Sequence, residues 1–340
     1  MFAIMENARL EELHLASDPA TGLQAIVAIH NTHLGPALGG CRYLGYADVD
    51  SAVRDAARLA RGMSYKAALA GLAQGGGKAV IIRPPHVADR AALFEAFGRF
   101  IDKLGGRYIT AVDSGTSGVD MDCIARHTPH VTSTTAGGDP SPHTALGVFA
   151  GIRATARARL GSDSLEGLTV AVQGLGHVGF ALAEHLAAAG ARLIVSDIDE
   201  GRLALAVEQL GAQPVAADAL LGVPCDILAP CGLGGAINAQ SIAKLRCAAV
   251  AGAANNQLDS PEMGDELTAR GILYAPDYVI NSGGLIFVAL QHQGRSPAEI
   301  TAHLAQIGHR LEEIYAEAQA ERRSPARVAD SLAERLIYGS

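Results

Sequence analysis

Two lysines and one aspartate stand at the ends of apolar segments, where they could carry proton-transfer chemistry. Lys66 closes an amphipathic helical pattern, and Lys78 follows three glycines and leads into the apolar run AVII. Asp113 ends the strand-like run YITAVD. A lysine and a carboxylate at neighbouring strand ends can exchange protons, which suits general acid–base catalysis. The same residues fit equally well as surface lysines that extend into water and as an aspartate that caps the next helix.

A glycine pattern further along the chain predicts a dinucleotide site. The run Gly174-Leu175-Gly176-His177-Val178-Gly179 follows an apolar strand and opens a helix, and the next strand ends on Asp197. In this context the glycines allow a tight turn, close approach of a pyrophosphate and close helix packing. An acid at the second strand end accepts bonds from ribose hydroxyls and repels a 2′-phosphate, so Asp197 favours NAD. Arg202 lies within reach of a 2′-phosphate, and a glycine turn without a ligand is the alternative.

The elements that must position these residues form two α/β regions. In the first region, periodicity predicts strands at 23–30, 41–43, 78–82 and 108–112 and helices at 49–61 and 88–104, with mixed strand directions. The small-residue stretch 133–142 is the expected boundary. In the second region, a helix at 143–160 precedes strands at 169–173, 192–197, 214–216, 226–229, 248–251 and 272–274. Short apolar strands at this spacing indicate a doubly wound parallel sheet. A capping box at 296–299 and the pair Ser324-Pro325 begin two C-terminal helices.

Composition narrows the class of protein. The chain has 340 residues, a net charge of −8 and 49% hydrophobic residues, which favours two buried cores and disfavours nucleic-acid binding. No apolar stretch is long enough to predict a membrane span. The five cysteines form no CxxC pair, so we expect free thiols in the cytoplasm. No histidine cluster has metal-ligand spacing, so we expect no metal.

Six blocks of the sequence resemble the signature blocks of the amino-acid dehydrogenases that act on glutamate, leucine, phenylalanine or valine. They are GPALGGCRY (35–43), ARGMSYKAALAGLAQGGGKAVII (60–82), RYITAVDSGT (107–116), GDPSPHTALGV (138–148), AGAANNQL (251–258) and YAPDYVINSGG (274–284). The resemblance is greatest to the members that act on leucine. It implies a substrate-binding and oligomerisation domain at 1–140, an NAD-binding domain at 141–323, and an active site in the cleft between them. The C-terminal helix at about 324–340 is expected to pack back on the first domain.

The resemblance also implies roles for individual residues. Lys78 and Asp113 match the catalytic pair, and Lys66 matches the lysine that binds the substrate α-carboxylate. Other matching positions are Gly39 and Gly40 beside that carboxylate, Thr144 near the nicotinamide carboxamide, Asn255 and Asn256 near the nicotinamide ribose and substrate amine, and Leu38, Met63, Ala111, Leu285 and Val288 along the side-chain pocket. The chain departs from the family pattern at Val112, where a carboxylate is usual, and at His177, where asparagine is usual.

The implied activity is a reversible, NAD-dependent oxidative deamination of a branched-chain L-amino acid. The apolar pocket positions offer no partner for a second carboxylate, so a glutamate substrate is disfavoured. We expect leucine as the preferred substrate, with valine and isoleucine also accepted. Leu285 resembles the phenylalanine-type enzymes, so phenylalanine or another apolar amino acid is the alternative, and a catalytically silent NAD-binding sensor is a third. The resemblance implies a homo-oligomer, a dimer or an octamer.

Overall fold

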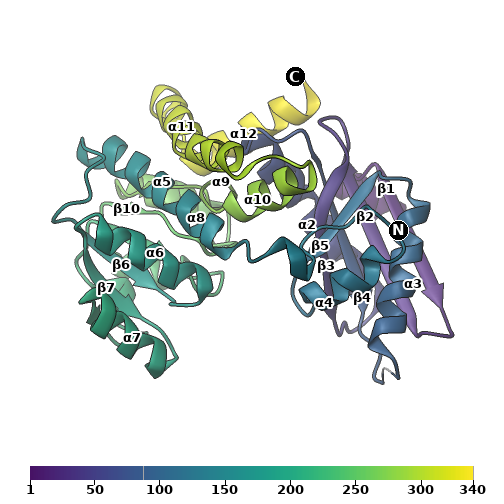
Figure 1. Ribbon diagram of the computed structural model, residues 1–340. Coiled ribbons are helices and arrows are strands. Elements are labelled where there is room, and N and C mark those ends of the chain that lie inside the picture. Colours follow the sequence, from purple (N-terminus) through teal and green to yellow (C-terminus); the bar gives the residue numbers. More distant parts are fainter. Residues whose placement is uncertain (87, 340) are drawn as a thin grey trace. The chain divides into compact units, whose positions relative to one another are not determined.

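The computed structural model describes residues 1–86 and 88–339 and divides the chain into two compact units (Figure 1). Unit 1 holds the described residues up to 139 together with 288–295 and 333–339. Unit 2 holds 140–287 and 296–332. These units differ from the expected domain ranges at three places: residues 140 and 324–332 belong to unit 2, and 288–295 belongs to unit 1.

Unit 1 is built on a five-stranded mixed sheet in the order β1-β2-β4-β3-β5. The strands are β1 (Glu12–Asp18), β2 (Leu23–Asn31), β3 (Ala37–Leu44), β4 (Gly75–Ile82) and β5 (Tyr108–Val112). β2 is antiparallel to β1 and β4, whereas β3 is parallel to β4 and β5. The expectation of mixed strand directions is confirmed. The edge strand β1 was not predicted, because its residues alternate between half-buried and exposed without a long apolar run.

Helices cover both faces of this sheet. They are α1 (Phe2–Ala8), α2 (Val49–Leu69), α3 (Arg90–Lys103) and α4 (Gly118–Ala125). Buried alanines of α2 pack with Ile26, Ala28 and Val80 on one face. Residues of α3 and α4 pack on the other face, with the strand residues that alternate with those just named, such as Val27 and Ala79.

Helix α2 is longer than predicted and carries two of the candidate site residues. The apolar periodicity predicted a helix over 49–61, closed by the segment 62–66, whereas α2 runs to Leu69. Gly62 is exposed, and a Cβ there would meet nothing within 4 Å, so it costs no packing. The buried stripe instead continues through Ser64 to Leu69. Ser64 lies directly against β4, since a Cβ on Gly76 would lie 2.0 Å from the Ser64 nitrogen.

Unit 2 contains a six-stranded parallel sheet in the order β11-β10-β9-β6-β7-β8. The strands are β6 (Thr169–Gln173), β7 (Arg192–Ser196), β8 (Gln213–Pro214), β9 (Ile227–Pro230), β10 (Ala249–Val250) and β11 (Leu273–Tyr274). Val170, Ala171 and Val172 are all fully buried, so both faces of the sheet are covered. The predicted doubly wound parallel sheet is confirmed, and the strand order changes direction between β6 and β9.

Helices separate most of the strands of unit 2, but only short 3-10 helices stand between β8, β9 and β10. The α-helices are α5 (Ser141–Leu160), α6 (His177–Ala188), α7 (Glu200–Leu210), α8 (Glu262–Ala269), α9 (Asp277–Ile280) and α11 (Pro297–Glu321), while α10 (Gly283–His292) and α12 (Pro325–Tyr338) begin in unit 2 and end in unit 1. The capping box of α11 is present, with Ser296 and Glu299 bonded to each other's backbone. No helix among the described residues is long and apolar enough to cross a membrane.

Candidate functional site

The centre of unit 1 holds an ion pair between Lys78 and Asp113. Lys78 lies on β4, and Asp113 follows the last residue of β5, with β3 between the two strands. The Lys78 Nζ contacts the Asp113 Oδ2, and the two side chains are 7% and 21% exposed. The lysine is therefore neither solvated nor remote from the aspartate. Of the two interpretations that the sequence left open, this geometry favours the chemical one.

Gly40 on β3 allows this pair to form across the intervening strand. A Cβ on Gly40 would lie 2.6 Å from the Asp113 Cβ and 2.8 Å from the Val112 carbonyl oxygen. A side chain there would push the carboxylate away from the lysine. The neighbouring Gly39 is fixed from the other face of the sheet, because the buried Tyr108 hydroxyl donates a 2.6 Å hydrogen bond to its carbonyl.

The charges around Asp113 keep its carboxyl group ionised. Burial alone would raise the pKa of Asp113, but the Lys78 charge, hydrogen bonds from Lys78 and from the Ser114 backbone, and the Arg42 charge together bring this pKa below its usual value. Asp113 is therefore an ionised carboxylate at neutral pH, in the form that can accept a proton.

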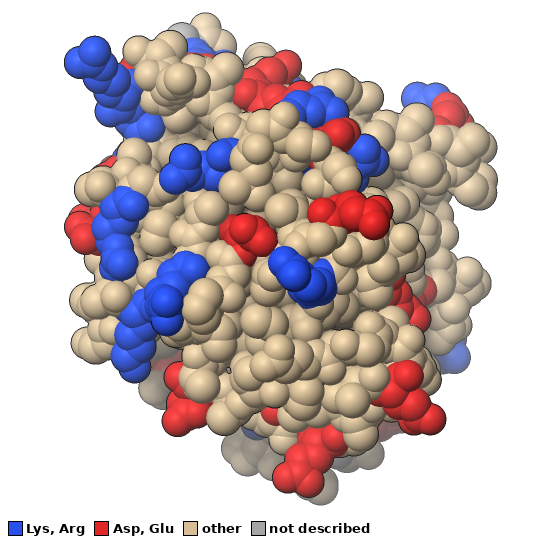
Figure 2. Space-filling view, turned by 90° about the vertical axis from the view of Figure 1, so that its left-hand side faces the viewer, with Lys and Arg blue, Asp and Glu red and all other residues tan. Residues whose placement is uncertain are grey.

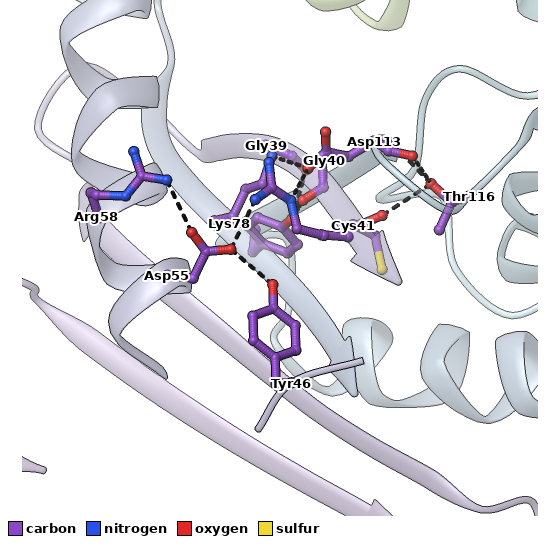
Figure 3. A network of polar contacts seen from close by, with 11 residues as sticks. Gly39, Gly40, Cys41, Tyr46, Asp55, Arg58, Lys78, Asp113 and Thr116 are labelled. Carbon is purple, nitrogen blue, oxygen red and sulfur yellow. Dashed lines mark hydrogen bonds and ion pairs between the residues drawn. The ribbon is translucent and has the colours of Figure 1, made fainter. Parts of the chain in front are cut away.

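Sequence reasoning missed a second carboxylate linked to this pair through Arg42. The Arg42 Nε donates to the Asp113 Oδ2 at 3.2 Å, and one terminal nitrogen donates to the Asp55 Oδ2 at 2.8 Å. Asp55 also accepts hydrogen bonds from Tyr46 at 2.8 Å and Arg58 at 3.0 Å, as Figure 3 shows. Arg42 lies within the quoted block 35–43, but no sequence pattern links it to residues 13 and 71 positions away.

Part of the predicted side-chain pocket shares a face of the unit 1 sheet with Lys78. In the register of the strands, Leu38, Gly40 and Ala111 point to the same face of the sheet as Lys78, which is the face that α2 covers. Met63 and Lys66 come from α2 itself. Val288 also belongs to unit 1, where its carbonyl accepts a 3.4 Å bond from the Thr132 hydroxyl. Leu285 belongs to unit 2.

The glycine loop of unit 2 lies at the point where the strand order reverses. Gly174 has a φ of +92°, which a residue with a side chain rarely adopts. A Cβ on Gly179 would lie 2.0 Å from the Gly174 carbonyl oxygen, so helix α6 can pack on the turn only with glycine there. A Cβ on Gly176 would meet nothing within 4 Å, which leaves this position open to a ligand at the start of α6. The tight turn at Gly174 and the close packing at Gly179 agree with the sequence, and the approach of a pyrophosphate at Gly176 stays a prediction.

Asp197 lies beside this loop, but its carboxylate is already engaged. Oδ2 accepts a hydrogen bond from the Leu175 N–H, and Oδ1 accepts one from the Asp199 N–H at 2.8 Å. The side chain is 6% exposed, and an Arg202 terminal nitrogen lies 4.0 Å from Oδ1. Asp197 therefore holds the loop in addition to presenting a negative charge at the strand end. Arg202 also pairs with Asp199 at 3.6 Å.

The remaining cofactor candidates also lie in unit 2. The Thr144 hydroxyl donates back to the Pro140 carbonyl at 3.2 Å. The Asn255 side chain accepts a 2.9 Å bond from Asn281, while Asn256 has a left-handed φ of 51°. Asn281 was not singled out from the sequence, although it stands in the quoted block 274–284. It donates to the Ala253 carbonyl as well, at 3.1 Å, and so fixes the segment that presents Asn255.

Within residues 1–86 and 88–339, no group of three or more His, Cys, Asp or Glu side chains could hold a metal ion. The face drawn in Figure 2 mixes basic and acidic side chains over broad uncharged areas, and neither sign dominates the part of that face shown in colour.

Known proteins resemble the chain over nearly its full length. A leucine dehydrogenase of Geobacillus stearothermophilus is 48% identical over 99% of this chain and 93% of that protein. A valine dehydrogenase of Streptomyces albus is 45% identical over 96% of this chain and 92% of that protein. The crystal structure of an L-tryptophan dehydrogenase from Nostoc punctiforme superposes with a TM-score of 0.91 at 39% identity, covering 100% of this chain and 99% of that one.

Two family models match the two parts of the chain. Residues 10–130 match the dimerisation domain of the Glu/Leu/Phe/Val dehydrogenases, and residues 195–334 match the glutamate/leucine/phenylalanine/valine dehydrogenase domain. Together with the relatives, these matches establish the family that the six sequence blocks indicate. The chain belongs to the Glu/Leu/Phe/Val dehydrogenase family of oxidoreductases.

Proposed function

We propose that this protein catalyses the reversible oxidative deamination of a branched-chain L-amino acid to the 2-oxo acid and ammonium, with NAD as cofactor. The observation that carries the proposal is the buried Lys78–Asp113 pair. It joins a proton acceptor to a fixed positive charge, in a chain whose other unit has a dinucleotide-binding loop. A silent NAD-binding sensor would have no use for such a pair.

Three residues of unit 1 are proposed to carry the steps of this reaction. Lys66 binds the substrate α-carboxylate. Asp113, ionised at neutral pH, takes a proton from the α-ammonium group and leaves a neutral amine that can release hydride. NAD, when bound, would supply the acceptor for the hydride of the substrate Cα. Lys78 then assists the addition of water to the resulting iminium carbon, and its ammonium stabilises the negative charge that develops on oxygen.

The nucleotide would be held by unit 2. The open position at Gly176 and the free N–H groups at the start of α6 suit a pyrophosphate. Thr144, Asn255 and Asn256 are proposed to contact the nicotinamide end. The Asp197 charge disfavours a 2′-phosphate, which supports NAD over NADP.

Leucine is the substrate that we propose to be preferred. Leu38, Ala111 and Val288 are apolar and buried, and they offer no partner to a side-chain carboxylate, so glutamate would lose its hydration without compensation. One methylene is worth about 1–3 kcal/mol in such a pocket, so valine and isoleucine should be slower substrates. The likeness to a tryptophan dehydrogenase makes an aromatic amino acid the second candidate.

We also propose a homo-oligomer in the cytoplasm. Residues 10–130 match a model that is described as a dimerisation domain, which supports an assembly of two or more copies. All five cysteines are free thiols, as is usual in a reducing compartment. Sedimentation would distinguish a dimer from an octamer.

The proposal is tested by following NADH absorbance with a panel of L-amino acids. We expect the highest kcat/KM with leucine, lower values with valine and isoleucine, weak turnover of phenylalanine and tryptophan, and none of glutamate. A preference for phenylalanine or tryptophan would mean that Leu285, more than Leu38 and Ala111, determines which side chain the pocket accepts. Failure of every amino acid to reduce NAD would overturn the proposed function.

A further inference from the structure

Arg42 is the second positively charged side chain that contacts the Asp113 carboxylate, after Lys78. The mechanism proposed above assigns no role to Arg42. Its Nε and the Lys78 Nζ both contact the same oxygen, Oδ2. Two cations on one oxygen fix the rotation of the carboxylate. Oδ1 is then the oxygen that we expect to accept the proton from the substrate amine.

Arg42 is in turn held by Asp55, from helix α2. The guanidinium donates to the Asp55 Oδ2 at 2.8 Å, and both side chains are 20% exposed. Tyr46 and Arg58 donate to the same carboxylate and hold it in place (Figure 3). A guanidinium is planar and can bind two carboxylates at once in fixed directions, whereas the donors of an ammonium rotate and set no such directions.

We propose that Arg42, held in place by Asp55, is a positioning residue that orients the Asp113 carboxylate toward the substrate amine. The inference rests on the proposed function, because it assigns Arg42 a task only if Asp113 accepts that proton. A shift of about 1 Å in a reacting group can lower a rate about a hundredfold, so an orienting contact of this kind matters for turnover.

The charge balance gives Asp55 a second effect on Asp113. The charged groups around the carboxylate are Lys78 from β4 and Arg42 from β3, with Asp55 and Arg58 from α2 behind Arg42. The buried Cys41 and Tyr108 are neutral at pH 7, since burial raises the pKa of both. Asp55 takes up part of the Arg42 charge, so Asp113 stays a stronger base than it would be beside two uncompensated cations.

The two substitutions Arg42→Gln and Asp55→Asn should therefore act in opposite directions on the Asp113 pKa. Loss of the Arg42 charge raises this pKa and moves the acid limb of kcat/KM to higher pH, by about one pH unit. Loss of the Asp55 charge leaves Arg42 uncompensated and moves that limb to lower pH. A contact that only stabilised the fold would not produce this difference in sign.

The experiment measures kcat and KM for leucine and NAD across pH in wild type, Arg42→Gln, Arg42→Lys, Asp55→Asn and the control Arg54→Gln. Arg54 is 66% exposed and pairs with Asp50 on the surface of α2, so this control should match wild type. We expect Arg42→Gln to lower kcat at least about tenfold with little change in KM, and Arg42→Lys to recover part of the loss. Thermal melts identify any variant that fails to fold, in which case Arg42→Lys and Asp55→Asn carry the test.

A double-mutant cycle with Asp113→Asn decides whether Arg42 acts through Asp113. Single-turnover measurements with enzyme in excess should show that Arg42→Gln adds little to the loss caused by Asp113→Asn. The inference would be overturned if the rate losses of the two single variants multiplied in the double variant, or if Arg42→Gln kept kcat within about twofold of wild type. Either result would leave the proposed function intact. A wild-type protein that oxidises no amino acid would instead overturn the proposed function, and this inference with it.

Discussion

The two units prepare their sites by different physical means. In unit 1, four charged side chains meet in a half-buried network: Lys78, Asp113, Arg42 and Asp55. In unit 2, the loop at 174–179 is shaped by glycine geometry and by backbone N–H groups, and its one engaged carboxylate, Asp197, accepts hydrogen bonds from the backbone.

The difference agrees with the two tasks that we propose for the units. Moving a proton requires groups whose charge changes, so a unit with that task must hold ionisable side chains in fixed contact. Holding a pyrophosphate requires close approach and a positive field, which a glycine turn at a helix N-terminus supplies without side chains. Substitutions in the two units should therefore have separable effects on turnover and on cofactor binding.

Lys78→Ala should show this separation most strongly. Removing the ammonium should lower kcat with leucine at least about a hundredfold, the usual scale of general acid–base assistance. The affinity for NAD, measured by calorimetry, should hardly change, because the nucleotide loop is unaffected. Lys103→Ala removes an exposed lysine of the same unit and serves as the control. Near-wild-type turnover of Lys78→Ala would remove Lys78 from the catalytic set.

A buried histidine should make the stability of unit 1 depend on pH. Burial, with smaller contributions from Arg61 and Arg9, lowers the pKa of His30 to about 4, and its ring nitrogens bond to the Ser64 and Tyr338 hydroxyls at 2.8 and 3.2 Å. The unfolded chain takes up a proton here near pH 6.5, whereas the folded chain does so only near pH 4. The stability should therefore fall as the pH drops through this window.

Between pH 7 and pH 5 the expected loss of unfolding free energy at His30 is on the order of 2 kcal/mol. Urea unfolding followed by circular dichroism measures it. His30→Gln cannot titrate and should show a flatter pH dependence, while the exposed His33→Gln should keep the wild-type slope. Equal slopes in all three proteins would contradict the assignment.

In unit 2, two glycines of one loop should behave differently when replaced by alanine. At Gly176 a Cβ has open space, so Gly176→Ala should keep the melting temperature of the free protein and weaken NAD binding about tenfold by obstructing the ligand. At Gly179 a Cβ would lie 2.0 Å from a carbonyl oxygen, so Gly179→Ala should lower the melting temperature as well. Unchanged NAD affinity in Gly176→Ala would show that the nucleotide does not approach there.

The smallest expected effect concerns cofactor choice. Asp197→Asn keeps an oxygen for the Leu175 N–H but loses the charge, so it should narrow the preference for NAD over NADP severalfold while the loop stays intact. Asp197→Ala should also narrow the preference for NAD over NADP. It should lower the affinity for NAD as well, because the loop loses its hydrogen bond to the Asp197 carboxylate. Glu208→Ala, an exposed acid on α7, is the control. Equal use of NAD and NADP by the wild type would show that Arg202 offsets the aspartate.

The two units also differed in how much of their site the sequence predicted. The geometry of the unit 2 loop could be predicted from the sequence, because its contacts join residues within a short segment, while the ligand contact at Gly176 stays a prediction. In unit 1 the resemblance pointed to Lys78 and Asp113, but neither Asp55 nor the role of Arg42 was found. Arg42 and Asp113 are 71 residues apart, and only the β3–β5 register brings them together. The end of α2 was missed for a similar reason, since its last residues are held by packing on β4, which is distant in the sequence from the start of the helix.

The central claim is that unit 1 deaminates an amino acid while unit 2 holds the cofactor that is reduced. The most direct test is the stoichiometry of products after limiting NAD is consumed with excess leucine. We predict one ammonium and one 2-oxo acid for each NADH formed. NADH formation without ammonium release would contradict the account, because the protein would then oxidise a different bond.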